Sequence, residues 1–173
     1  MSDTPNKQTS PVISDDHAIL GTTTEAGGDR LAESLARIGV LLDCHRVELF
    51  RQIDGSYQVV GWWTALGHAA PEHGLEPVSL PAGWFPWNLG NVRPTESLFV
   101  RNAGSLPTRP SGGGRIRQLG MGSSLCLPLS DGPGGVDEAL GALCVYWADE
   151  RAEWPDDLAE AAKDLGRDAL LDS

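Results

Sequence analysis

This 173-residue chain has three cysteines, whose thiols could form disulfides, bind a metal or act as nucleophiles. Their spacing restricts which of these reactions are possible. With Cys44, Cys126 and Cys144, a disulfide framework would leave one thiol over. Structural zinc sites use closely spaced pairs such as Cys-x2-Cys, and the sequence contains none. Cys126 and Cys144 lie in apolar runs, where free cysteine behaves as a small hydrophobic residue. The sequence therefore predicts three buried free thiols.

Histidines and a glycine-rich segment suggest two further chemistries, a metal site and a phosphate cradle. His68 and His73, with Glu72, have the right side chains for a metal, but their irregular spacing is typical of a solvated loop. The run Ser111-Gly112-Gly113-Gly114-Arg115 lacks the Walker spacing and no strand leads directly into it. We interpret it as a flexible loop, and we predict no metal ligands and no catalytic residues.

Large aromatic side chains are more numerous than the core of such a domain requires. Trp84, Phe85 and Trp87 lie together in one apolar stretch, 81–89, within a middle region rich in Pro and Gly. Rings of this size are rarely left in water, since each buries about 150–250 Å² when packed. Two interpretations stay open: these rings pack as core and lid, or a few of them line a cavity for a planar or apolar ligand.

Charge and hydropathy exclude several classes of protein. The chain has 24 acidic and 13 basic residues, a net charge of −11, and its basic residues are scattered. It therefore lacks the basic patch that binding a nucleic-acid backbone requires. No apolar run reaches the roughly 18 residues of a membrane-spanning helix, and the N-terminus lacks the pattern of a secretory signal. We expect a cytoplasmic protein without a nucleic-acid or membrane partner.

The elements that position these side chains follow from the spacing of apolar residues. Spacings of three and four predict helices at 29–42 and 155–171. Alternating or continuous apolar runs predict strands at 47–52, 57–63, 97–101, 123–129 and 139–147. Asp54-Gly55 supplies the tight turn between the first two strands.

This order of elements predicts an α+β fold with a central antiparallel sheet of five to six strands and both helices on one face. We expect the domain to span residues 29–173. Residues 1–28 are rich in Ser, Thr, Asp, Gly and Pro, and we interpret them as a flexible N-terminal arm.

Three motifs in the last third of the chain resemble those of the GAF family. The run Gly120-Met121-Gly122-Ser123-Ser124-Leu125-Cys126-Leu127-Pro128-Leu129 resembles the family's Ser- and Pro-containing strand. The segment 140–145 resembles its Gly-containing return strand, and Trp154-Pro155-x-Asp157 resembles the start of its closing helix. Residues 46–51 and the Phe85-Pro86-Trp87 turn are similar to bacterial GAF modules that precede kinase or diguanylate cyclase outputs.

The resemblance implies a sensory or regulatory domain without catalysis. Such a domain would bind a small molecule, or transmit a signal through a dimer to an output domain or partner protein. Some GAF domains reduce free methionine sulfoxide with cysteines in the loop that here spans 102–122, which contains none. Others attach a tetrapyrrole through a Cys-His dipeptide, but Cys44-His45 precedes the first strand. A GAF-fold enzyme and a pure interaction module without ligand are the alternatives, and no cofactor is identified.

The candidate pocket is expected on the sheet face away from the helices. Trp62 or Trp63 would form its floor, because neighbours on a strand point to opposite faces. Trp84, Phe85 and Trp87 would form its walls and roof.

Polar contacts in that pocket would come from Ser123 or Ser124, and from Arg51 if the ligand is anionic. The apolar stripes of the two terminal helices exceed what one sheet face can cover. We therefore expect a homodimer through these helices, burying about 1,200–2,000 Å² in total.

Overall fold

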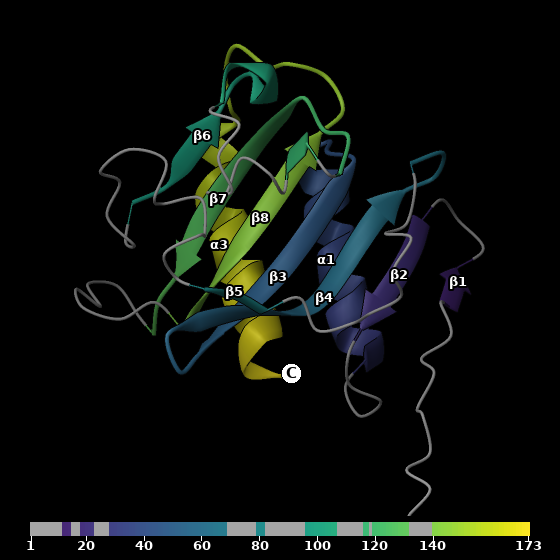
Figure 1. Ribbon diagram of the computed structural model, residues 1–173. Helices are drawn as coiled ribbons and strands as arrows, with labels where there is room; N and C mark the ends of the chain where they lie inside the picture. The colour runs from purple at the N-terminus through teal and green to yellow at the C-terminus, as the bar shows by residue number, and fades with distance from the viewer. Residues whose placement is uncertain are drawn as a thin grey trace, which may run out of the picture.

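The described part of the chain forms eight strands and two long helices (Figure 1). The computed structural model describes residues 12–14, 18–22, 28–68, 79–81, 96–106, 116–117, 119–131 and 140–173. The strands are β1 (Val12–Ser14), β2 (Ala18–Thr22), β3 (Arg46–Ile53), β4 (Ser56–Ala65), β5 (Ser79–Pro81), β6 (Leu98–Val100), β7 (Ser123–Leu129) and β8 (Gly141–Trp147). The helices are α1 (Gly28–Leu41) and α3 (Asp156–Leu171), with a short 3-10 helix, η2 (Ala103–Ser105).

All strands join one antiparallel sheet in the order β1-β2-β4-β3-β8-β7-β6, and β5 pairs with the start of β4. Both helices lie behind this sheet in Figure 1, α1 against β2, β4 and β3 and α3 against β7, β3 and β8. The five predicted strands and both helices are therefore confirmed, as is the placing of the helices on one face.

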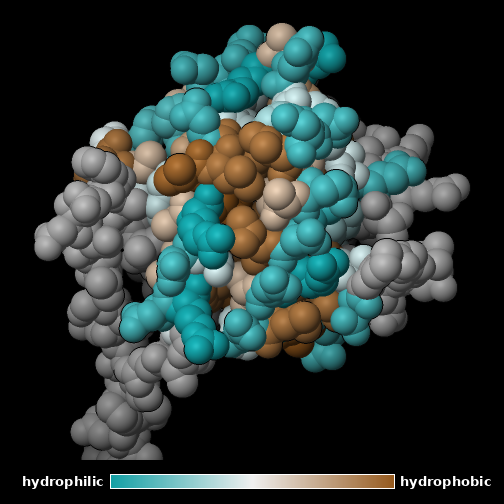
Figure 2. Space-filling model, turned by 180° about the vertical axis from the view of Figure 1, so that it is seen from behind, coloured by the Kyte–Doolittle hydropathy of each residue, from teal (hydrophilic) through white to brown (hydrophobic). Residues whose placement is uncertain are grey.

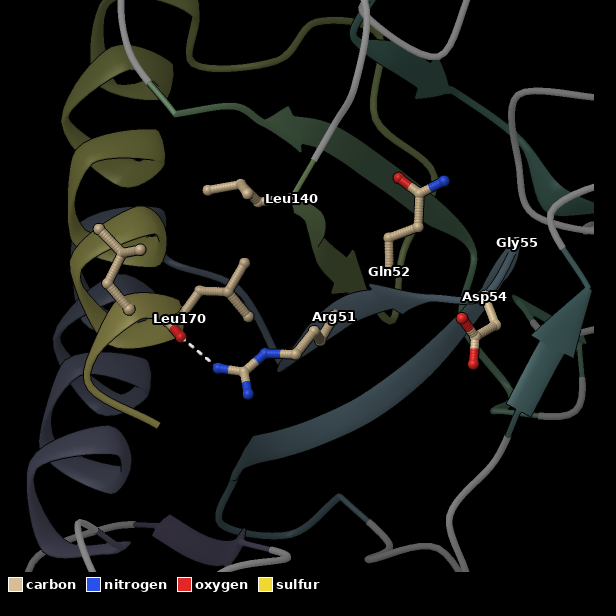
Figure 3. A pocket seen from close by; sticks show the side chains of 7 residues that line it. Arg51, Gln52, Asp54, Gly55, Leu140 and Leu170 are labelled. Carbon is tan, nitrogen blue, oxygen red and sulfur yellow. Dashed lines mark hydrogen bonds between the residues drawn. The ribbon is translucent and has the colours of Figure 1, made fainter.

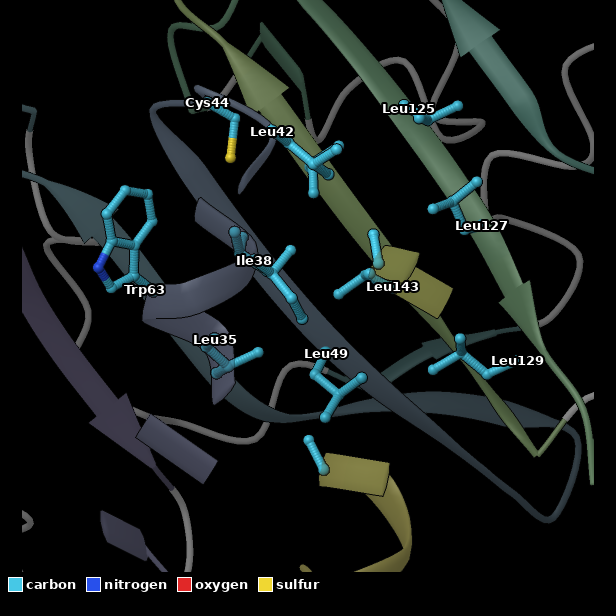
Figure 4. Packing of buried hydrophobic residues seen from close by; sticks show 14 of the residues in the cluster. Leu35, Ile38, Leu42, Cys44, Leu49, Trp63, Leu125, Leu127, Leu129 and Leu143 are labelled. Carbon is cyan, nitrogen blue, oxygen red and sulfur yellow. The ribbon is translucent and has the colours of Figure 1, made fainter. Parts of the chain in front are cut away.

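The face under the helices, called the helix face below, carries the larger apolar core. Its core joins the α1 stripe to alternate residues of the central strands, as Figure 4 shows. Trp63 lies on this face against α1, where a Cβ added to Gly39 would come within 2.4 Å of its ring. Because Gly39 has no side chain, the helix packs directly against the Trp63 ring. A larger residue would not fit between them.

The other face, called the distal face below, carries a second apolar cluster with polar members. Its buried residues include Phe50, Trp62, Cys126, Cys144 and Tyr146. Two separate cores, one on each face, explain why β7 and β8 read as continuously apolar runs rather than alternating ones.

A β-bulge in the β3–β4 hairpin decides which β4 side chains reach the distal face. Leu49 pairs with Gly61 and Phe50 with Val59, so Val60 is the extra residue. In a regular strand, residues three apart point to opposite faces. Because of the bulge, Val59 and Trp62 share the distal face.

The structure departs from the sequence interpretation at the edges of the sheet. Two segments inside the expected flexible arm are strands: β1 pairs with β2, and β2 pairs with Gly61–Ala65 of β4. With β5, they raise the sheet from the expected five or six strands to eight. Pro128, which has no backbone N–H to donate, lies beyond the β6 ladder, because among the described residues β6 pairs only with 124–126 of β7.

Candidate functional site: a buried polar cluster on the distal face

Arg46 and Glu48 form a buried ion pair on the distal face. They alternate along β3 and so point to the same side, where Arg46 pairs in register with Tyr146 and Glu48 with Trp62 and Cys144. Their side chains are 1% and 0% exposed. Charged residues are almost never buried this fully unless they are paired.

Glu48 is the acceptor at the centre of this cluster. Arg46 donates to its Oε1 from Nε at 3.0 Å and from Nη2 at 2.6 Å. The Tyr146 hydroxyl donates to its Oε2 at 2.9 Å. The guanidinium carbon of Arg46 lies 5.5 Å from the Trp62 ring centroid, so the cation also has an aromatic contact. The two opposite charges cancel, which leaves the cluster neutral overall.

Three polar atoms on this face have no hydrogen-bond partner among the described residues: Arg46 Nη1, Trp62 Nε1 and Ser124 Oγ. Ser124 on β7 pairs with Tyr146 on β8, and Tyr146 pairs with Arg46 on β3. Trp62 on β4 pairs with Glu48 of β3, so the three atoms lie close together across four adjacent strands. A buried polar group without a partner costs about 1–3 kcal/mol. Together, the three atoms lower the stability of the free protein. They also leave hydrogen-bond donors on this face that a ligand with acceptor atoms would satisfy.

Two of the predicted pocket residues, Trp62 and Ser124, lie on the distal face. Trp63 instead lies on the helix face. The Ser123 hydroxyl donates to the Asp149 carbonyl at 2.8 Å and so ties β7 to the segment after β8. One residue of each predicted pair therefore lies on the distal face. That Trp62 or Ser124 binds a ligand stays a prediction. The predicted roof residues Trp84, Phe85 and Trp87 lie outside the described residues.

Arg51 lies apart from Trp62 and Ser124, and ligand binding by Arg51, which we expected only for an anionic ligand, stays a prediction. Its Nη2 donates to the carbonyl of Leu170 and, at 3.0 and 2.8 Å, to the carbonyl and hydroxyl of Ser173. Arginine at this place satisfies carbonyls at the C-terminal end of α3. Figure 3 shows it beside a hollow of about 550 Å³ whose walls also include Gln52, Asp54 and Leu140.

The predicted site residues did not include Arg46, Glu48 and Tyr146. A signal was present: Arg46 and Glu48 are two positions apart and alternate with the apolar residues Val47 and Leu49, so both had to face the same side. Two opposite charges on one buried face indicate a paired cluster.

The histidines form no metal site among the described residues. No group of three or more potential metal-ligating side chains occurs there, and His73 and Glu72 lie outside them. His45 and His68 have ring centroids 4.3 Å apart, and burial, with the charge of His68, lowers the pKa of His45.

All three cysteines are free and buried. Burial raises the pKa of Cys44 to about 12 and raises that of Cys144 well above its usual value. Protonated thiols are poor nucleophiles, because the thiolate is the reactive form.

No family model matches this sequence, and no curated protein matches it. None of the described helices is long and apolar enough to cross a membrane.

Solved structures match over most of the chain. A domain assigned to a two-component sensor histidine kinase of Sinorhizobium meliloti is 19% identical, over 86% of this chain and 91% of that one, with a TM-score of 0.60. The blue-light-absorbing GAF domain of PixJ from Thermosynechococcus elongatus is 19% identical, over 86% and 88%, with a TM-score of 0.62. A red/green cyanobacteriochrome in its red-light-absorbing state is 14% identical, over 85% and 93%, with a TM-score of 0.66. Identities this low establish a shared fold and nothing more specific.

Proposed function

We propose that this chain, which has the GAF-domain fold of the structures it matches, is a non-catalytic sensory or regulatory domain that binds a small molecule on its distal face. The observation that carries the proposal is the set of unpartnered buried atoms, Arg46 Nη1, Trp62 Nε1 and Ser124 Oγ. A ligand that supplies acceptors to these atoms would recover their desolvation cost on binding.

The chemistry of the ligand follows from the charges around these atoms. A guanidinium nitrogen and an indole nitrogen can only donate, so the ligand must present acceptors. Glu48 already balances the charge of Arg46 at 2.6 Å, so an anionic ligand would leave a net negative charge in a buried place. Uncharged acceptors, such as carbonyl oxygens or ring nitrogens, fit this face better.

Covalent attachment through Cys44 does not fit this arrangement. Cys44 packs in the core of the helix face, and its thiol donates to the Arg46 carbonyl. The raised pKa values of Cys44 and Cys144 also argue against a thiol-dependent reductase. We therefore favour a ligand that is held without a covalent bond.

Two tryptophans provide a matched test. Trp62 and Trp63 each have an unpartnered Nε1, but they face opposite sides of the sheet. Substitution by phenylalanine removes this donor and keeps an aromatic ring. The purified chain would be titrated with a library of uncharged carbonyl and heterocyclic compounds, with binding read by calorimetry.

For a compound that binds, Trp62→Phe should weaken affinity about 2- to 10-fold, since one hydrogen bond is worth about 0.5–1.5 kcal/mol. Trp63→Phe should leave the affinity unchanged. Equal effects of the two variants would contradict a site on the distal face. If the library yields only compounds that bind elsewhere, the interaction-module alternative replaces this proposal.

We also propose that the domain signals as a homodimer through α1 and α3, to an output domain or a partner protein in the cytoplasm. Apolar residues gather on the helix-covered side of the molecule (Figure 2), and Val40 and Leu171, on the two helices, are 77% and 60% exposed. Light scattering at high micromolar concentration tests this: a dimer is expected, and Val40→Lys should shift it toward monomer. A monomer mass for the unsubstituted chain would contradict it.

A further inference from the structure

Two of the three cysteines face each other across neighbouring strands of the distal face. Cys126 on β7 and Cys144 on β8 are directly paired in register, and their sulfur atoms lie 2.8 Å apart. Both thiols are free, and these residues are 1% and 0% exposed. The site already described does not use either of them.

The backbone at this pair meets the requirement for a disulfide. Directly opposed residues of antiparallel strands have Cα atoms about 4.5–5.5 Å apart. Disulfide-bonded cysteines have Cα atoms about 4.4–6.8 Å apart and sulfur atoms about 2.05 Å apart. The sulfur atoms of Cys126 and Cys144 thus need to move by less than about 1 Å, without movement of the strands.

We propose that Cys126 and Cys144 form a dithiol site that a small peroxide closes into a disulfide between β7 and β8, and that a dithiol reductant reopens by thiol–disulfide exchange. One thiolate attacks the peroxide oxygen and becomes a sulfenic acid as the O–O bond breaks and water leaves. The second sulfur then attacks the sulfenic sulfur, forming the S–S bond and releasing a second water. In total, the two thiols lose two protons and two electrons, and one hydrogen peroxide becomes two waters.

Burial raises the pKa of Cys144, so little of its thiolate is present at neutral pH. Attack by this sulfur follows its thiolate population, which rises up to about tenfold per pH unit below the pKa. Closure that begins at Cys144 should therefore be faster at higher pH.

Closure would act on the polar cluster through both strands. The Cys126–Cys144 pair lies two residues along from the Ser124–Tyr146 pair, and Cys144 is also paired in register with Glu48. A covalent link at this position fixes the spacing of the strands that carry Ser124 and Tyr146. This consequence for ligand binding rests on the proposed function, whereas formation of the disulfide does not.

The test treats the full chain with hydrogen peroxide, then denatures it, alkylates the remaining thiols and maps the peptides by mass. We expect Cys126 and Cys144 to be lost together as one linked peptide pair, Cys44 to stay alkylated, and dithiothreitol to restore all three. The rate should increase from pH 7 to pH 9. Cys44→Ala is the matched control, since it lies on the helix face and should leave the linkage intact.

Cys126→Ala and Cys144→Ala should each abolish the link, but mapping of the unsubstituted chain decides the proposal even if these variants fold poorly. Three thiols that persist after prolonged exposure would overturn it. So would oxygen addition at either cysteine without a link, or a link that joins two chains. If the disulfide forms but ligand affinity does not change, the redox site stands and only its coupling to the ligand face is rejected.

Discussion

Replacing Ser124 by alanine should stabilise the free protein, which is unusual for a substitution at a fully buried position. The Ser124 hydroxyl is completely buried and has no partner among the described residues. Removing such a group avoids a desolvation cost of about 1–3 kcal/mol. The variant loses only a few dispersion contacts, each worth about 0.1–0.2 kcal/mol. We therefore expect the free energy of unfolding to rise by about 1 kcal/mol.

The neighbouring serine is the control, because it is equally buried and its hydroxyl has a partner. Ser123 donates to the Asp149 carbonyl at 2.8 Å, so Ser123→Ala should lower the free energy of unfolding by about 0.5–1.5 kcal/mol. Each kcal/mol shifts the melting temperature by about 2–4 °C in a domain of this size.

Calorimetric or fluorescence melting of the two variants beside the unsubstituted chain gives the answer. The melting temperature should rise for Ser124→Ala and fall for Ser123→Ala. A similar fall for both would mean that the Ser124 hydroxyl is satisfied within the protein, and the main argument for a ligand on the distal face would be refuted.

Three further predictions concern stability. Gly39→Ala should lower the free energy of unfolding by about 1–3 kcal/mol, since its Cβ would meet the Trp63 ring at 2.4 Å; urea denaturation measures this. Arg46→Met should cost about 3–5 kcal/mol by removing the cation that balances the buried Glu48 charge. Adding Glu48→Leu should recover most of this loss, which a double-mutant cycle of urea midpoints would show. The pKa of His45 is lowered from 6.5 in the folded protein, so on acidification the unfolded chain takes up this proton at a higher pH than the folded chain. The contribution of His45 to the free energy of unfolding is therefore present above pH 6.5 and is lost as the pH falls below it. Urea midpoints between pH 8 and pH 5 should decline less for His45→Asn than for the unsubstituted chain.

Much of the fold was predictable because its main elements are long and periodic. The α1 and α3 stripes and the apolar runs of β7 and β8 give strong local signals, and Asp54 and Gly55 have the positive φ angles, 48° and 75°, that a tight hairpin turn requires. The three added strands, β1, β2 and β5, have three to five residues each. The pairing of β2 and β5 with β4 depends on contacts distant in sequence, which local periodicity does not report, and β1 is held only by β2.

The candidate site was less predictable, because side-chain direction depends on register. The sequence placed one of Trp62 and Trp63 on the distal face but could not say which, since the bulge at Val60 sets the phase of β4. We predicted Arg51 rather than Arg46 as a pocket residue, although both lie on β3. Arg51 instead contacts the C-terminal end of α3, more than a hundred residues away in sequence, and a local pattern does not report such a contact.

The pairing of β2 with β4 has a practical consequence for anyone who shortens this chain. A truncation that starts at α1, where the sequence pattern places the domain border, removes the strand that hydrogen-bonds to Gly61–Ala65. That stretch, which includes Trp62 and Trp63, would become an open sheet edge, a template on which the strand of another molecule can add. The shortened protein should then aggregate, or dimerise edge to edge, and its association state would report the missing strand rather than the helices.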